Sequence, residues 1–190
     1  MQLSTWTSTV ALCLAAAFAG TAQAQGNWDV VLNGHAIHVN AAKEWNESNW
    51  GLGVEHEFNP AGHWVKLALA NGFKDSLGSP SFMAGGGLKR RFRMFSDDVY
   101  FDVGMVGFLM TREDVNHNRP FPGALPAMTF GTKNVALNVT YMPDSIVDRV
   151  TKANLSDPQM KGVFFLQLKL NASLFGPHGR RGHLLADTGE

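Results

Sequence analysis

The sequence predicts an all-β protein, an eight-stranded antiparallel transmembrane β-barrel of the outer membrane. Three observations lead to this prediction. Apolar side chains alternate with polar or small ones along short segments, and the connections between these segments are alternately long and short. No stretch after the first 24 residues approaches the roughly 18 continuous apolar residues that would indicate a membrane-spanning helix.

The N-terminal segment, residues 1–24, has the composition of a signal peptide that is removed on export. An apolar stretch from Val10 to Gly20 precedes Ala22-Gln23-Ala24, a small-x-small cleavage pattern. Cys13, the only cysteine of the 190-residue chain, lies in this segment. We therefore expect a mature chain without thiols, which excludes disulfide scaffolds, thiolate metal sites and cysteine nucleophiles.

Eight segments after the signal peptide have the composition of strands. We expect these strands at residues 28–40, 50–58, 63–72, 81–94, 98–111, 125–130, 134–142 and 162–170. The contrast between faces is clearest in the seventh, where Val135, Leu137 and Val139 share one face and Asn138 and Thr140 share the other. One face of each strand is compatible with lipid, and the other is mixed or polar.

The lengths of the connections favour a membrane barrel over a soluble sandwich. Long connections at 41–49, 73–80, 113–124 and 143–161 alternate with short turns centred on 59–62, 95–97 and 131–133. A barrel with both termini in the periplasm has long loops outside and tight turns inside. Hydrocarbon also demands closure, because an open sheet edge would leave backbone polar groups unpaired. A closed sheet of eight strands has an interior that side chains fill or one small ligand occupies.

The barrel domain is expected to span residues 25–170, followed by a different kind of segment. Glycine, proline and arginine are frequent between Gly176 and Gly182, so residues 171–190 are predicted to be a disordered periplasmic tail. The chain carries 16 acidic and 16 basic residues, and no net positive charge exists to recruit nucleic acid. No group of His, Asp and Glu residues has the spacing of a metal site.

Six short motifs occur in one order between Trp50 and Pro143. They are Trp50-Gly51-Leu52-Gly53, Phe73-Lys74-Asp75-Ser76, Ala84-Gly85-Gly86-Gly87, Thr111-Arg112, the proline-rich stretch from Pro120 to Pro126, and Thr140-Tyr141-Met142-Pro143. In this set the chain resembles the outer-membrane lipid A palmitoyltransferases, the PagP family. The resemblance implies transfer of an acyl chain, typically palmitoyl, from a glycerophospholipid donor to a lipid A acceptor. We expect a monomer in contact with outer-membrane lipid that uses no cofactor and no metal.

The resemblance maps the catalytic histidine, aspartate and serine of the family onto His35, Asp75 and Ser76. Exchange of an ester needs a base that works near pH 7 and a hydroxyl that can hydrogen-bond the reacting oxygen, and histidine and serine supply these groups. His38, on the opposite face of the first strand, is the rival assignment, although the spacing to the next motif favours His35. The predicted topology brings all these residues to the outer rim of the barrel.

Two further residues are candidates for binding substrate. Arg112, at the outer end of the fifth strand, can hold a lipid phosphate through its bidentate guanidinium. The resemblance aligns Gly87 with the floor of an acyl pocket, where an absent side chain leaves room for hydrocarbon. Pro120, Pro122 and Pro126 remove backbone donors where the sixth strand begins, and in the family such a gap is a lateral route for lipid.

Two other functions remain open at the level of sequence. A phospholipase or lipid A deacylase would use the same residues with water as the acyl acceptor. A non-catalytic barrel that supports the envelope or adheres to surfaces would not depend on the hydroxyl of Ser76 or the imidazole of His35.

Overall fold

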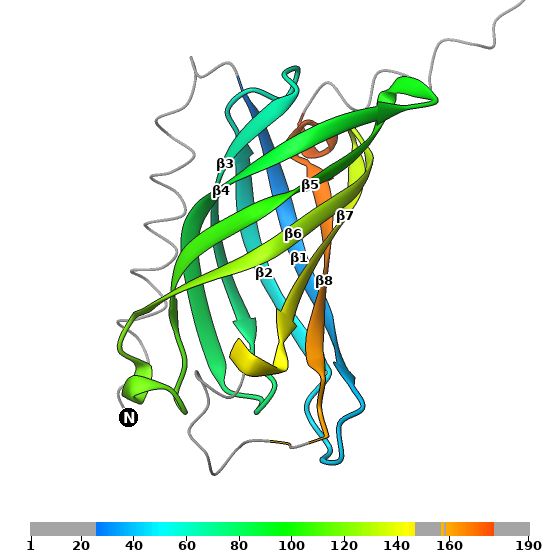
Figure 1. The fold of residues 1–190 in the computed structure, drawn as a ribbon. Coiled ribbons are helices and arrows are strands. Elements are labelled where there is room, and N and C mark those ends of the chain that lie inside the picture. The colour runs from blue at the N-terminus through cyan, green and yellow to red at the C-terminus, as the bar shows by residue number, and fades with distance from the viewer. Residues whose placement is uncertain (1–25, 147–156, 158, 177–190) are drawn as a thin grey trace, which may run out of the picture.

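The computed structural model describes residues 26–146, 157 and 159–176, which form a closed barrel (Figure 1). The strands are β1 (Asn27–Val39), β2 (Ser48–Glu57), β3 (Trp64–Lys74), β4 (Pro80–Met94), β5 (Ser96–Thr111), β6 (Phe121–Thr132), β7 (Val135–Pro143) and β8 (Gly162–Asn171). Each strand pairs antiparallel with its neighbours in sequence, and β8 pairs with β1 to close the sheet. The predicted eight-stranded antiparallel barrel is confirmed.

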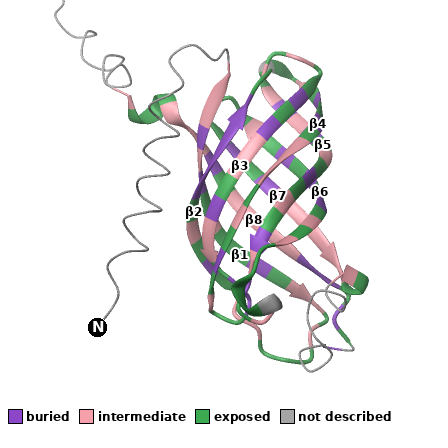
Figure 2. Cartoon of the chain, turned by 90° about the vertical axis from the view of Figure 1, so that its left-hand side faces the viewer, coloured by how far each residue is buried: buried purple, intermediate pink, exposed green. Residues whose placement is uncertain are grey.

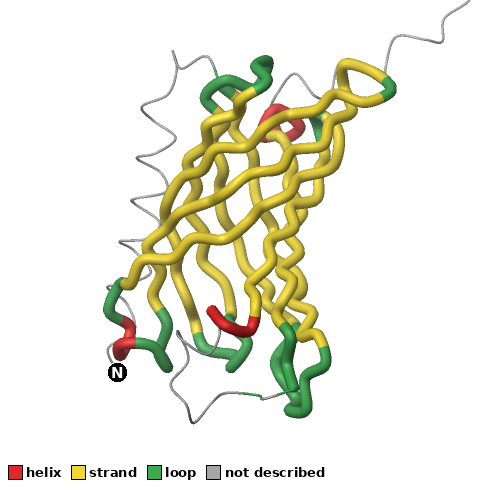
Figure 3. Tube along the Cα trace, in the orientation of Figure 1, coloured by secondary structure: helices red, strands yellow, loops and turns green. Residues whose placement is uncertain are grey.

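The long and short connections lie at opposite ends of the barrel. The long connections that follow β1, β3 and β5 gather at the lower end in Figures 1 and 3, and the short turns lie at the upper end. We call the end with the long loops the outer end, and residues 40–47 and 75–79 the first and second outer loops. The short helix η1 (Asn116–Asn118) belongs to the third. Most strand boundaries lie within two residues of the prediction, but β6 begins at Phe121 instead of residue 125.

Burial in this molecule is the reverse of that in a soluble protein. Large apolar side chains are exposed on the outside of the barrel, among them Leu52, Trp64 and Leu109, while seven charged side chains are buried inside the sheet. Figure 2 shows buried and exposed residues alternating along the strands. An outward apolar surface with an inward polar one is the pattern of a barrel that sits in lipid. Within the described ranges, no helix is long and apolar enough to cross a membrane.

The inner half of the barrel interior, toward the short turns, contains a charged cluster. Its members are Asp29, Glu55, Glu57, Lys89, Arg91, Asp102 and Lys169. Lys169 contacts Glu55 at 2.8 Å and Asp29 at 3.2 Å, and it also contacts Glu57. Arg91 donates from two nitrogens to Asp102 at 2.8 and 2.9 Å. Every base of the cluster is therefore paired with at least one acid, as buried charges require.

The ends of the chain agree only in part with the predicted domain limits. β8 ends at Asn171, whose side chain accepts a hydrogen bond from the Ser173 amide at 3.0 Å. Residues Ala172–Phe175 form the 3-10 helix η3, so the first part of the predicted disordered tail has regular structure. The predicted signal peptide, residues 1–24, and residues 177–190 lie outside the described part of the chain.

Candidate active site

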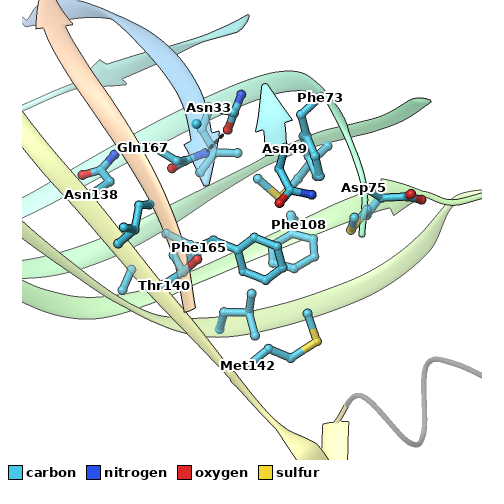
Figure 4. Close-up of a pocket in the computed structure, with 18 of the residues that line it drawn as sticks. Asn33, Asn49, Phe73, Asp75, Phe108, Asn138, Thr140, Met142, Phe165 and Gln167 are labelled. Atoms are coloured by element: carbon cyan, nitrogen blue, oxygen red, sulfur yellow. Dashed lines mark hydrogen bonds between the residues drawn. The ribbon is translucent and has the colours of Figure 1, made fainter. Parts of the chain in front are cut away.

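A pocket occupies the outer half of the barrel interior (Figure 4). Its wall is largely apolar, with Leu69, Phe108, Leu125, Met142 and Phe165 among the side chains that line it. At its outer mouth lie Asp75, Ser76 and Arg112, and at its inner end Glu55 and Lys89 of the charged cluster. The pocket therefore leads from a polar mouth, through an apolar wall, to a charged floor.

A hydrogen bond between His38 and Ser76 lies at the outer end of the barrel. The Nε2 atom of His38 is 3.0 Å from the Oγ atom of Ser76, a distance at which a proton can pass between base and hydroxyl. β1 supplies the histidine and the second outer loop supplies the serine, so the barrel joins residues that are 38 positions apart. The His38 side chain is 2% exposed, and the aromatic ring of Trp45 stacks on it at 5.5 Å.

A β-bulge in β1 determines which histidine meets Ser76. Asn33 pairs with Gln167 and His35 with Leu166, so Gly34 is an extra residue on β1. An extra residue reverses the alternation of faces along a strand. Without the bulge His35 would share the interior face of Asn33, whereas with it His38 does.

The sequence predicts that His35 acts together with Ser76, but in the structure these two side chains are not hydrogen-bonded to each other. The His35 side chain borders the pocket but is 51% exposed, and its Nε2 atom lies 3.6 Å from the carboxylate of Glu47. Among described contacts, the hydrogen bond of Ser76 goes to the rival histidine, His38. The physical reason is the bulge, which the two-residue pattern of the sequence does not reveal.

Asp75 is adjacent to Ser76 but directs its carboxylate into its own loop. One carboxylate oxygen accepts hydrogen bonds from the amides of Leu77 and Ser79, at 2.9 and 3.0 Å. The other accepts from the Ser81 hydroxyl at 3.2 Å and lies 3.7 Å from Arg112. In the described part of the chain, no hydrogen bond or ion pair connects Asp75 to a histidine. Asp75 therefore fixes the shape of the loop that presents Ser76.

Arg112 lies buried at the pocket mouth. Its guanidinium donates to both carboxylate oxygens of Asp114, at 2.9 and 3.2 Å, and approaches Asp75 at 3.7 Å. A guanidinium has five N–H donors, and the contacts with Asp114 use two of them. The sequence predicts that the Arg112 guanidinium binds a lipid phosphate through two N–H groups. In the structure two of its N–H groups bind the carboxylate of Asp114.

The first outer loop is attached to a residue that is distant in sequence. Asp157 accepts hydrogen bonds from the amides of Ala42 and Lys43, at 2.8 and 2.9 Å, and from the indole of Trp45 at 3.4 Å. These donors, the Lys43 amide first, hold the pKa of Asp157 below its usual range. Asp157 thereby fixes Trp45, which stacks on His38. Sequence reasoning missed this attachment, since nothing in the spacing of the residues announces it.

The sheet is interrupted beside the pocket, between β6 and β7. β6 pairs with β5 along its whole length, from Phe121 to Thr132. It pairs with β7 only from Ala127 to Gly131. Pro122 and Pro126 are four residues apart, so both lack a donor toward the same neighbour. The outer part of the β6/β7 seam therefore has no ladder, at the position where the prolines predicted an interruption.

Gly87 lies on the interior face of β4, between Met83 and Lys89, which both line the pocket. A Cβ atom at this position would lie 2.6 Å from the carbonyl oxygen of Met105 and 2.8 Å from Val106 Cγ1. Neighbouring atoms would have to move at such separations. The missing side chain therefore allows β4 and β5 to approach closely, whatever it also contributes to the pocket.

The site combines a base, a hydroxyl, a cation and an apolar pocket. A buried imidazole bonded to a hydroxyl can move a proton during exchange of an ester, and the pocket can exclude water from an acyl chain. Within the described ranges, no group of three or more His, Cys, Asp and Glu side chains is arranged to hold a metal ion. The arrangement fits acyl transfer on lipid.

Comparisons with known proteins agree with this chemistry. Residues 21–150 match the family described as antimicrobial peptide resistance and lipid A acylation protein PagP. The lipid A acyltransferase PagP of Bordetella pertussis is 31% identical over 126 residues, which cover 63% of this chain and 68% of that protein. The protein of the same name from Methylobacillus flagellatus is 32% identical over 100 residues, 52% of this chain and 53% of that protein.

Among solved structures, the outer membrane protein Ail of Yersinia pestis aligns with a TM-score of 0.40 and 10% identity, over 77% of this chain and 99% of Ail. This likeness is too distant to carry an argument, and the fold rests on the strand pairing itself. The family match covers more than half of the chain and confirms the resemblance seen in the motifs. The chain belongs to the PagP family of lipid A acylation proteins, acyltransferases of the outer membrane.

Proposed function

We propose that this outer-membrane acyltransferase moves a palmitoyl or similar long acyl chain from a glycerophospholipid to lipid A in the outer leaflet. The observation that supports the proposal most directly is the hydrogen bond between His38 and Ser76 at the outer end of the barrel, with Ser76 lining the mouth of an apolar pocket. Lipid A resides in the leaflet that this end of the barrel faces. The base and the hydroxyl would therefore meet both lipids at one interface.

His38 is the proposed base, in place of His35. Its Nε2 atom would take the proton from the attacking hydroxyl of lipid A as the oxygen of that hydroxyl bonds to the acyl carbon of the phospholipid. The bond from this carbon to the glycerol oxygen then breaks, and the imidazolium returns the proton to the departing lysophospholipid. Ser76 contacts the same nitrogen and would hydrogen-bond the reacting oxygen. Asp75 would contribute by holding the loop of Ser76 in shape.

The pocket is the proposed place for the acyl chain. Hydrocarbon would run along Leu69, Phe108 and Leu125 and end above the charged floor, because burying methylenes against Lys89 and Glu55 would strip these groups of polar contacts. The interrupted β6/β7 seam is the proposed entrance from the bilayer. Arg112 would use its remaining donors on the donor ester or phosphate, and Gly87 would contribute to the depth of the pocket.

The proposal can be tested with purified protein in detergent, a glycerophospholipid and lipid A. Mass spectrometry should show lipid A heavier by one acyl chain, and Ser76→Ala and His38→Ala should each abolish this product. Ser79→Ala, in the same loop, is the matched control and should retain activity. Release of free fatty acid in place of acylated lipid A would identify a hydrolase, and no acyl product from folded wild-type protein would identify a non-catalytic barrel.

A further inference from the structure

The ring of His38 has one satisfied nitrogen and one that lacks a hydrogen bond. Nε2 contacts Ser76, whereas Nδ1 is buried and has no hydrogen-bond partner. A buried polar atom without a partner is rare, and at a functional site it indicates a contact that forms in another state of the reaction. The nearest carboxylate contact of this atom is Oε1 of Glu47, at 3.6 Å.

Glu47 is held beside His38 by the backbone. The amides of Ala36 and Asn49 donate to its carbonyl oxygen at 3.0 and 3.2 Å, and the amide of His38 approaches its carboxylate at 3.4 Å. On the loop side, Trp45 stacks on the His38 ring and is tied to Asp157. The carboxylate therefore reaches Nδ1 with only a small change of side-chain rotamer, and no strand has to move.

Asp75 does not supply this contact. Its two carboxylate oxygens are engaged by Leu77, Ser79 and Ser81, and its nearest cation is Arg112. The carboxylate that is close enough to orient the His38 ring is therefore that of Glu47.

We propose that Glu47 is a positioning residue that completes a Ser76–His38–Glu47 relay in this chain. A carboxylate at Nδ1 keeps the proton on that nitrogen, leaves Nε2 free to act as base, and stabilises the imidazolium after Nε2 has taken a proton. No atom is transferred to Glu47 itself. The inference rests on the proposed acyl transfer, because it assigns a partner to the base of that reaction.

Other ionisable groups around His38 must be considered in any measurement of pH dependence. His35 contacts the Glu47 carboxylate at 3.6 Å, Asp75 is next to Ser76, and Arg112 approaches Asp75 at 3.7 Å. Removing the charge of Glu47 takes away the attraction that favours protonated His38, so the imidazole should lose its proton at lower pH. The acid limb of the pH profile should move in the same direction.

The test compares Glu47→Gln with Glu44→Gln, an exposed residue of the same loop that undergoes the same change of charge. Steady-state transfer from phospholipid to lipid A is measured from pH 5 to 9 on protein that shows the wild-type heat-dependent gel shift. Glu47→Gln should lower kcat about 10-fold to 100-fold and leave KM within about twofold of the wild-type value. This loss is a part of the roughly 10²- to 10⁴-fold rate increase that a general base contributes. Its acid limb should lie at lower pH, and Glu44→Gln should match wild type.

Glu47→Asp, which restores the carboxylate on a shorter side chain, should recover part of kcat and return the acid limb toward wild type. The inference is overturned if Glu47→Gln keeps wild-type kcat, or if kcat falls while the acid limb stays where it is, which would indicate support of the loop alone. Failure of the proposed function would look different, because the wild-type protein itself would then make no acylated lipid A.

Discussion

The two halves of the barrel interior differ in composition, since one contains charged side chains and the other mainly apolar ones. The inner half holds the charged cluster, in which each cation is paired with at least one carboxylate and Lys169 contacts three, Asp29, Glu55 and Glu57. The outer half holds an apolar pocket whose mouth carries Ser76, and Ser76 is hydrogen-bonded to His38. In the inner half the charges of the cluster are all paired, whereas the outer half contains a buried imidazole nitrogen without a hydrogen-bond partner.

The difference shows how one small barrel separates stability from reactivity. The ladder of the sheet continues around the barrel at the level of the charged cluster, whereas β6 and β7 separate beside the pocket. We expect substitutions in the two halves to have different consequences.

The largest effect should come from breaking the charged cluster. Lys169→Ala would leave three carboxylates without their shared cation, and removing one partner of a buried ion pair costs about 3–5 kcal/mol. We expect a loss of this size in the free energy of unfolding, measured by urea titration with the heat-dependent gel shift as the signal. Lys133→Ala removes an exposed pair with Asp98 and should change stability by no more than about 1 kcal/mol. Equal losses would show that the cluster is not what holds the barrel.

The next effect should appear in activity and leave the fold intact. Ser76→Ala and His38→Ala should each reduce acyl transfer at least about 100-fold while the gel shift is retained. The double variant should be no worse than the more damaged single variant, since groups that act as a unit are not additive. His35→Ala should lose less than His38→Ala. The reverse order would return the role of base to His35.

A smaller effect should concern the length of the transferred chain. Ala127 lines the pocket and packs with Leu67, Val106 and Leu125. Ala127→Leu should displace terminal methylenes, and each one left unburied costs roughly 0.8 kcal/mol, about a fourfold preference for the shorter chain. Product profiles from donors of mixed chain length would measure it.

Ala124→Leu, on the exposed face of the same strand, is the control for Ala127→Leu and should leave the profile unchanged. Gly87→Met remains a prediction of shorter chains, but contact with the Met105 carbonyl should also lower its folding yield. An unchanged profile in well-folded Ala127→Leu would place the pocket floor elsewhere.

The smallest effect should come from the attachment of the first outer loop. Asp157 has a lowered pKa, so its hydrogen bonds are present at and above its ordinary value of 3.8 and are lost as the pH falls through the still lower folded value. Activity between pH 5 and 8 should therefore show no limb due to Asp157. Asp157→Ala should lower activity a few-fold and speed tryptic cleavage after Lys43. Asp144→Ala is the control, and unchanged cleavage would mean that Asp157 does not hold the loop.

The sequence predicts most of the fold because a membrane barrel repeats two simple signals. Alternation along Val135 to Val139 and the alternation of loop lengths both follow from lipid on one side and water at the ends. The sequence predicts the start of β6 at residue 125, four residues after the observed start at Phe121, because prolines interrupt pairing with a neighbouring strand. In the structure Pro122 and Pro126 keep their pairing with β5 and lack only the pairing with β7.

The site was harder to predict because it depends on register and on distant contacts. The motif Phe73-Lys74-Asp75-Ser76 predicts a loop at Asp75 and Ser76, and the structure has both residues in the second outer loop. The choice between His35 and His38 depends on the bulge at Gly34, a single irregularity that composition does not encode. The contact between Asp157 and Trp45 joins residues 112 positions apart, and only the closed barrel brings them together.

The bulge at Gly34 also affects how insertions and deletions would act on β1. Deleting Gly34 would remove the extra residue opposite β8 and keep His38 on the interior face. Inserting one residue into the regular part between Asp29 and Asn33 would exchange the interior and exterior faces of the strand on one side of the insertion. The length of β1 can therefore change by one residue at Gly34 while His38 stays on the interior face.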